Sequence, residues 1–165
     1  MTASEGDSGA GRTSADVVQL GRTAEARDPA ADTRELHSFL DRQRNAVLAT
    51  VRADGSPQVT PVWYHWDGDA VRISSPNWTK KVANIRRDPR VSVCIDDQVS
   101  GTYATLFGTA ELIDGDAVSE QTWPILIKYL HPDEAAVRWQ RLNADRDRVV
   151  IRVEPQRIVW RRAVH

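Results

Sequence analysis

The sequence has little of several features that would define its function at once, and each shortage excludes a class of protein. Among its 165 residues there is one cysteine, Cys94, so an intrachain disulfide and a cysteine-based zinc site are both excluded. A lone cysteine within an apolar strand usually packs as a small hydrophobic residue, so we expect its side chain to point into the core. No apolar run approaches the roughly 20 residues that span a bilayer.

The charge balance and the N-terminal pattern exclude further partners. The 22 Lys+Arg and 23 Asp+Glu residues give a formal net charge of −1, which provides no global affinity for nucleic acid or for an anionic membrane. The N-terminus lacks a basic flank followed by an apolar stretch, so no secretory signal is expected. These absences predict a cytoplasmic protein without nucleic-acid or membrane partners.

Common catalytic signatures are missing as well. The sequence contains no Walker-type phosphate loop, no GxGxxG, no GxSxG and no HExxH. Its four histidines are scattered without metal-ligand spacing, so no metal site is predicted. His65, within "WYHWD", and its neighbour Tyr64 are candidate proton donors, but a packed imidazole is the simpler interpretation and no catalytic residue is assigned.

Residues 1–31 are predicted to be a disordered tail. They are rich in Ala, Gly, Ser and Thr and cannot bury enough apolar surface to offset the entropy of ordering. The apolar stretch "VVQL" at residues 17–20 is the candidate for docking on a neighbour. One ordered domain is expected over residues 32–165, beginning with a helix that Asp32 caps and Glu35 supports.

From Ala46 the pattern changes to the two-residue period of strands. Three runs separated by turns predict an antiparallel meander, at residues 46–51, 58–66 and 70–75. Pro61 places the second run at a sheet edge or at a bulge, because proline cannot donate to a β-ladder.

The second half of the chain alternates helices with strands. A basic helix is predicted to bury Val82 and Ile85 and to end at Asp88-Pro89. The elements expected are helix 78–87, strands 90–95 and 102–113, helices 115–129 and 133–142, and a final strand 148–161 that is broken at Pro155. This order predicts a mainly β, α+β fold: a six-stranded antiparallel barrel, closed or split, with peripheral helices.

The distribution of lysine points to one candidate site. The chain has three lysines, and two of them, Lys80 and Lys81, stand side by side where a helix begins. Cations in a first turn oppose the helix dipole unless an anion binds there. Hydroxyls of Ser74, Ser75 and Thr79 precede them, so N–H groups, hydroxyls and two ammoniums can converge on a phosphate. A solvated basic helix face is the alternative.

Tryptophans flank the same turn. Trp63, Trp66 and Trp78 are placed to wall a flat aromatic ligand, although tryptophan fills cores and dimer interfaces equally well. The helices between Trp123 and Trp139 likewise have two interpretations, a lid or dimer contact and a buried packing helix.

The segments "AVLATVRADGSPQVTPVWYHWDGDAVRISS", "TKKVANIRRDPRVSVCID" and "GTAEL", in this order, resemble the pyridoxamine 5′-phosphate oxidase-like superfamily, whose fold is the FMN-binding split β-barrel. More narrowly, they resemble the actinobacterial flavin- or deazaflavin-dependent oxidoreductases that use coenzyme F420. The resemblance covers roughly residues 35–161. It implies a homodimer with a cofactor in each of two clefts along the interface. The matching cofactor-contacting positions are Gln58, Thr60, Pro61 and Val62 along the ring, Ser74 and Ser75 at the ribityl chain and phosphate, and Thr79, Lys80 and Lys81 at the phosphate.

The resemblance implies an oxidoreductase that transfers a hydride from reduced coenzyme F420 to a flat conjugated acceptor, such as a quinone, an enone or a linear tetrapyrrole. Thr79 stands where relatives often have arginine, so one cation is missing. That difference favours the alternative of an FMN-dependent oxidase or reductase of the same fold. A third possibility is a protein that binds a flavin, haem or pyridoxal phosphate without turnover.

Overall fold

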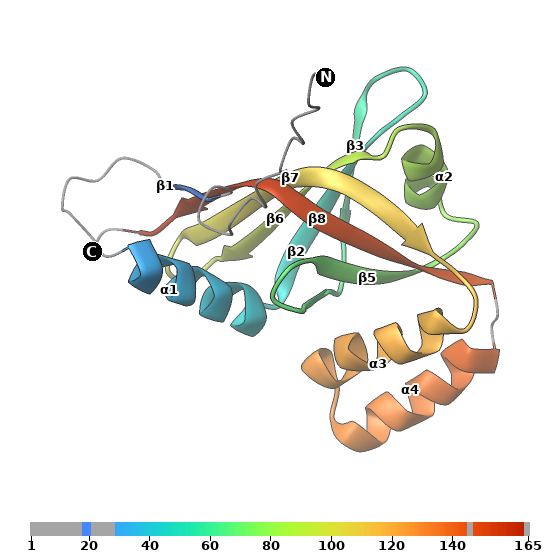
Figure 1. Cartoon of the computed structure of the whole chain (residues 1–165). Coiled ribbons are helices and arrows are strands. Elements are labelled where there is room, and N and C mark those ends of the chain that lie inside the picture. The colour runs from blue at the N-terminus through green and yellow to red at the C-terminus, as the bar shows by residue number, and fades with distance from the viewer. Residues whose placement is uncertain (1–17, 21–28, 145–146, 164–165) are drawn as a thin grey trace, which may run out of the picture.

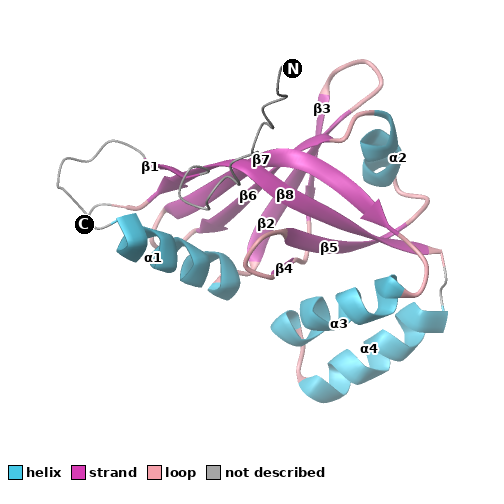
Figure 2. Ribbon diagram, viewed as in Figure 1, coloured by secondary structure: helices cyan, strands magenta, loops and turns pink. Residues whose placement is uncertain are grey.

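One strongly curved sheet forms the body of the molecule, with α1 at one end and the α3–α4 hairpin at the other (Figures 1 and 2). The structure, a computed structural model, describes residues 18–20, 29–144 and 147–163. In chain order its elements are β1 (Val18–Leu20), α1 (Pro29–Arg42), β2 (Asn45–Val51), β3 (Pro57–Pro61), β4 (His65–Trp66), β5 (Val71–Pro76), α2 (Lys80–Arg87), β6 (Arg90–Asp97), β7 (Thr102–Ile113), α3 (Ala117–Tyr129), α4 (Pro132–Ala144) and β8 (Arg148–Arg161).

The strands follow the order β3-β2-β6-β7-β8-β5-β4, and every neighbouring pair in this order is antiparallel. β1 lies off this path and pairs in parallel with the second half of β8. The predicted fold class, an α+β split barrel, is confirmed. The predicted strand number is wrong, because the run 58–66 divides into β3 and β4 and residues 18–20 add a further strand.

Pro61 ends β3, which among the described residues pairs only with β2 and is therefore an edge strand, as the sequence predicted. The first helix begins earlier than expected, at Pro29, so Asp32 is not its cap. Instead Arg162, just after β8, forms ion pairs with Asp32, at 2.9 Å, and with Glu35. The two carboxylates lie one helical turn apart, which lets one guanidinium bind both.

Residues 18–20, within the tail predicted to be mostly disordered, form β1 and pair with β8. The rest of that segment up to residue 28 lies outside the described residues.

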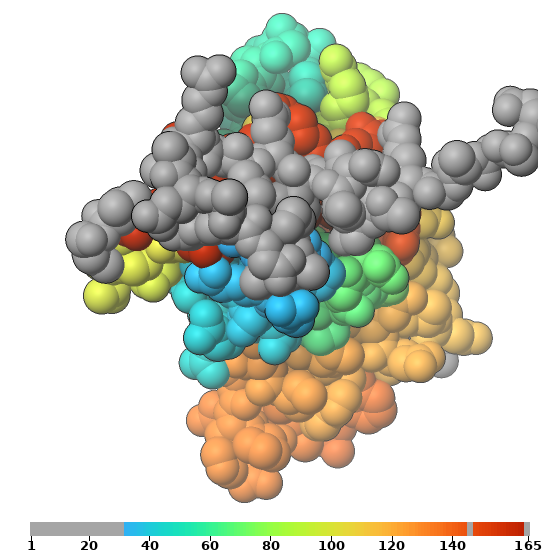
Figure 3. Space-filling view, turned by 60° about the vertical axis from the view of Figure 1, so that its left-hand side comes forward, coloured from blue at the N-terminus to red at the C-terminus, as the bar shows by residue number. Residues whose placement is uncertain are grey.

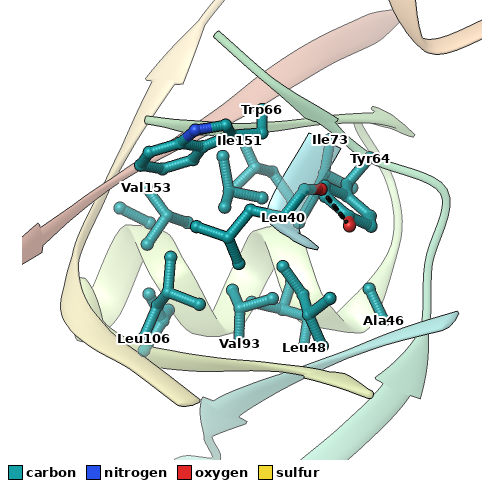
Figure 4. Packing of buried hydrophobic residues seen from close by; sticks show 14 of the residues in the cluster. Leu40, Ala46, Leu48, Tyr64, Trp66, Ile73, Val93, Leu106, Ile151 and Val153 are labelled. Carbon is teal, nitrogen blue, oxygen red and sulfur yellow. Dashed lines mark hydrogen bonds between the residues drawn. The ribbon is translucent and has the colours of Figure 1, made fainter. Parts of the chain in front are cut away.

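The core lies inside the curve of the sheet. Alternate residues of the central strands point inward and are buried, among them Leu48, Val93, Leu106 and Ile151. Leu36, Phe39 and Leu40 of α1 close one end of this core. Figure 4 shows Tyr64 at one side of the core, where its buried hydroxyl donates to the carbonyl oxygen of Leu40.

The alternation also corrects the expected position of Cys94. Val93 and Ile95 on either side of it are buried, so Cys94 points to the opposite, outer face of β6, where it is half-buried. The apolar run "VSVCI" concealed this, because both faces of the strand carry small or apolar residues.

β8 passes through Pro155 as one strand, contrary to the predicted break. Opposite it, Phe107 pairs with Arg157 and Gly108 with Pro155, so Gln156 is an extra residue and forms a bulge. On the other edge of β8, pairing with β5 stops at Val153 and pairing with β1 starts at Ile158. Pro155 therefore lies between the end of the β5 pairing and the start of the β1 pairing, and its missing N–H removes no hydrogen bond from either of these two ladders.

Gly108 is required at this bulge. A methyl group on its Cα would collide with the carbonyl oxygen of Glu154 and would lie 3.3 Å from the Cα of Pro155. Both atoms belong to the backbone of β8 and cannot rotate away.

Within the described ranges no helix is long and apolar enough to cross a membrane.

We therefore expect Gly108→Ala to lower the free energy of unfolding by about 2–3 kcal/mol, because the two central strands must separate to admit the methyl group. Urea denaturation measures the change. Thr109→Ala, at the adjacent exposed position, is the control and should lie within about 0.5 kcal/mol of wild type. Equal stability of Gly108→Ala and wild type would show that the close approach is absent.

Candidate functional site

A cavity of about 290 Å³ lies between the sheet and the α3–α4 hairpin, which forms a separate lobe of the surface (Figure 3). We call it the central cavity. Its wall combines residues from β3, the segment after it, β5, α2, α3, α4 and β8. They are Pro61, Val62, Trp63, Ile73, Ser74, Pro76, Lys81, Thr122, Ile125, Leu126, Arg138, Leu142 and Arg148.

Hydrogen bonds join hydroxyl groups and a cation on this wall. In the register of β5 with β8, Ser74 pairs with Val150, so Arg148 is its diagonal neighbour on the same face. Arg148 Nη2 donates to Ser74 Oγ at 3.1 Å. Thr122 Oγ1 lies 3.1 Å from the same oxygen and donates to the carbonyl of Val118 at 2.7 Å.

Lys81 brings a second cation to the central cavity. Burial, and the nearby charge of Arg148, lower the pKa of its half-buried ammonium. No aspartate or glutamate is among the described residues that line the cavity. Lys81 and Arg148, which we call the cation pair, therefore create a positive potential that suits an anion.

The helical period of α2 explains why the two adjacent lysines differ. Val82 and Ile85 face the core, as predicted, and Lys81 lies one turn before Ile85 at the edge of that face. Lys80 lies on the other side and is exposed. The helix is fixed by buried Asn84, whose Nδ2 donates to Thr50 Oγ1 at 3.0 Å and to Gln58 Oε1 at 3.1 Å.

A second depression of about 380 Å³, here the outer hollow, adjoins the central cavity at Pro61, Val62 and Trp63, which line both. Its remaining wall comes from the start of β2, the end of β6 and the residues next to them. These residues are Arg44, Asn45, Ala46, Val47, Asp96 and Gln98. The two spaces together offer a cationic cavity beside a larger, partly apolar hollow.

Trp63 stands where the two spaces meet and is held from several sides. Its ring stacks on that of Tyr129, with centroids 4.7 Å apart and 4° between the planes. The Tyr129 hydroxyl donates to the carbonyl of Arg44 at 2.9 Å and accepts from the backbone N–H of Tyr64 at 3.3 Å. The guanidinium of Arg138 lies over the Trp63 ring, 5.3 Å from its centre.

Comparison with known proteins gives this architecture a family. A family model described as pyridoxamine 5′-phosphate oxidase matches residues 32–160, most of the chain. The chain belongs to the pyridoxamine 5′-phosphate oxidase family. The resemblance read from the sequence is thereby confirmed.

Solved structures of the same fold include three that are informative for this family member. An F420 reductase is 29% identical with a TM-score of 0.59, over 74% of this chain and 94% of that chain. A conserved hypothetical protein from Mycobacterium tuberculosis is 24% identical with a TM-score of 0.69, over 92% and 90%. A heme binding protein from Mycobacterium smegmatis is 22% identical with a TM-score of 0.61, over 78% and 53%. The last two likenesses show the fold alone.

The structure brings some of the predicted cofactor residues together and leaves others apart. Pro61, Val62, Ser74 and Lys81 line the central cavity. The other candidates do not line it: Gln58, Thr60, Ser75, Thr79 and Lys80. Gln58 is engaged with Asn84, as described above, and Thr60 is half-buried within β3.

Two of these hydroxyls are used within the turn itself. Thr79 Oγ1 donates to the carbonyl of Pro76 at 3.0 Å and lies 3.1 Å from the oxygen of buried Ser75. They close the turn before α2. The cofactor contacts of all the predicted residues stay a prediction.

The sequence interpretation missed Arg148, Arg138 and Thr122. Arg148 follows Ser74 by 74 residues, and only the register of β5 with β8 reveals that they meet. The two strand patterns were visible in the sequence, but their pairing was not.

Neither candidate proton donor lines the central cavity or the outer hollow. The Tyr64 hydroxyl is buried against the end of α1, and this burial raises its pKa. Burial, together with the charge of Lys128, lowers the pKa of half-buried His65. No catalytic acid or base is assigned.

Lys128 supports the same region from α3. Its Nζ lies 3.7 Å from the centre of the Tyr64 ring and donates to the carbonyl of Leu40 at 3.3 Å. Burial lowers its pKa to about 8, although the nearby charge of Asp41 acts in the opposite direction. The Lys128 side chain therefore loses its proton at a lower pH in the folded protein than in the unfolded chain.

This shift predicts how stability changes with pH. Between pH 8 and 9.5 the unfolded chain binds a proton at Lys128 that the folded protein has begun to release, so the free energy of unfolding should rise with pH. Urea denaturation of wild type and Lys128→Met across this range measures it. The slope should be smaller in Lys128→Met and unchanged in Lys80→Met, where the lysine is exposed. Parallel curves for all three proteins would contradict the prediction.

Proposed function

We propose that this family member is an oxidoreductase that binds coenzyme F420 and transfers a hydride to a flat conjugated acceptor. The observation that carries the proposal is the cation pair beside Ser74. Lys81 and Arg148 lie close enough for one charge to depress the pKa of the other, at a half-buried position. A bound phosphate removes this repulsion and receives hydrogen bonds from both cations.

The residues present fit the phosphate of such a cofactor. Lys81 offers a mobile point charge, and Arg148 offers a planar fork of donors that Ser74 orients. Arg148 thus brings a guanidinium to the site, although Thr79 stands where relatives often have arginine. Pro61 and Val62 lie between the cavity and the outer hollow, which supports the placement of a ring system along this edge.

The chain's own contribution is binding, orientation and exclusion of water. When bound, a reduced deazaflavin supplies the hydride itself. Ile125 and Leu126 of α3 give the cavity an apolar, buried side. Trp63, fixed by Tyr129, gives the shared rim an apolar ring edge for a conjugated acceptor.

Two cofactors remain to be distinguished. The 29% identity to an F420 reductase, over nearly all of that chain, supports F420. An FMN-dependent oxidase or reductase is the second candidate, because the compact group of Ser74, Lys81 and Arg148 also suits a terminal monophosphate. A cytoplasmic location stays a prediction.

Parallel titrations with coenzyme F420 and FMN, followed by fluorescence, test the proposal. Lys81→Ala and Arg148→Ala should each weaken F420 binding roughly 10- to 100-fold, the range for a hydrogen bond to a charged group. Lys80→Ala removes the same charge one residue away, on the exposed side, and should change affinity less than about threefold.

Tighter binding of FMN than of F420 would assign the site to the second candidate. If Lys80→Ala and Lys81→Ala weaken F420 binding equally, the effect is one of overall charge and not of a contact made by Lys81. Failure of both cofactors to bind would end the proposal, whatever the variants do.

We also propose that the protein is a homodimer. The outer face of the sheet carries half-buried small or apolar side chains on three adjacent strands, β2, β6 and β7. They are Val47, Ala49, Cys94, Thr105 and Phe107. A second copy on this face would also cover the outer hollow, and with it the ring end of the proposed cofactor site.

Ala49→Glu should convert the dimer into a monomer, because it places a charge at the middle of this face without disturbing the core. Light scattering after size-exclusion chromatography measures the mass. Gln140→Glu, exposed on α4, is the control and should stay dimeric. A wild-type monomer, or a dimer that persists in Ala49→Glu, would contradict this interface.

A further inference from the structure

Arg138 is a charged group on the central cavity that the phosphate site does not use. It belongs to α4, whereas Lys81 and Arg148 come from α2 and β8. In the part of the chain that the structure describes, its guanidinium makes no ion pair and no hydrogen bond, although Glu134 lies one turn earlier on the same helix. Its contact is with the ring of Trp63, 5.3 Å away.

The contact with the Trp63 ring leaves the N–H donors of the guanidinium without a partner among the described residues. These five donors form a planar fork. The fork that results matches the two oxygens of a carboxylate. Beside it, the edge of the Trp63 ring is apolar, and stacking on Tyr129 fixes the orientation of the ring.

The position of Arg138 is set by packing of α4 on α3. The adjacent Trp139 makes an edge contact with Trp123, with ring centroids 6.0 Å apart, and its Nε1 donates to the carbonyl of Ser119 at 3.2 Å. Arg138 belongs to a different element from either member of the cation pair. The cavity wall therefore carries a third cation, supplied by α4.

We propose that Arg138 and Trp63 together recognise a carboxylate on a flat conjugated ligand, and that this ligand is the acceptor. The second half of the statement rests on the proposed function, whereas the recognition itself does not. Arg138 binds the carboxylate through two parallel hydrogen bonds while the conjugated part of the ligand packs against the edge of the Trp63 ring. Neutral acceptors of the same shape lack this contact and bind less tightly.

The test compares two probes that differ only in this charge, anthraquinone-2-carboxylate and anthraquinone-2-carboxamide, by calorimetric titration of the full chain without added cofactor. Wild type should bind the carboxylate about tenfold more tightly than the amide. Arg138→Gln should abolish the preference. Arg141→Gln, which removes an exposed charge from the same helix but not from the central cavity, should keep it.

Lys81→Ala and a titration with coenzyme F420 separate the alternatives. Lys81→Ala should still bind the carboxylate probe more tightly than the amide probe. If Lys81→Ala loses this preference, the carboxylate binds at the cation pair and the proposal is overturned. Arg138→Gln should bind F420 within about twofold of wild type, and a tenfold loss would assign Arg138 to the cofactor instead.

The proposal is also overturned if neither probe binds, if Arg138→Gln retains the preference, or if Arg141→Gln loses it. A wild type that prefers the carboxylate but does not bind F420 would refute the proposed function alone. The Arg138–Trp63 recognition element would then stand without its assignment to an acceptor.

Discussion

Pairing along β8 is the constraint on which the other parts of this fold depend. The strand pairs with β7 on one edge, and with β5 and then β1 on the other, so it links three parts of the chain. The bulge opposite Gly108 lets one continuous strand change neighbours without losing its ladder. At its start β8 carries Arg148 to the central cavity, and just after its end Arg162 holds α1. The same strand thus positions the candidate site and closes the core.

The central cavity exists because the α3–α4 hairpin covers one end of the sheet instead of leaving it open. α3 supplies an apolar wall, and α4 supplies a charged rim over Trp63. Opposite them, α2 and β8 provide the cation pair. Burial of like charges side by side is unfavourable for the protein alone, and such an arrangement is typical of binding sites for anions. The local chemistry therefore marks this part of the molecule as the candidate site.

Local patterns in the sequence were enough to predict most of this framework. The two-residue period placed the strands, Asp88-Pro89 ended the basic helix, and Pro61 marked the sheet edge. Ser74 and Lys81 could be selected because they lie close together in the sequence, on either side of one turn.

Features that depend on pairing between distant segments could not be found in this way. Arg148 is in this class, since its partner Ser74 is 74 residues away. Cys94 shows a second limit: with small or apolar residues on both faces of β6, the pattern could not indicate which face is buried. Asp32 shows a third, because a carboxylate near a helix start suits a cap as well as an ion pair with distant Arg162.

The composition of the cavity wall has a consequence for the behaviour of the whole molecule. Its residues come from β3 and the segment after it, and from β5, α2, α3, α4 and β8, so an occupant contacts several elements at once. Binding that requires all of them at once is linked to folding, and the melting temperature should then report occupancy through the ratio of ligand concentration to its dissociation constant. A higher cellular concentration of the natural ligand would lower the unfolded fraction of the protein and so slow its proteolysis, independently of any reaction that the protein catalyses.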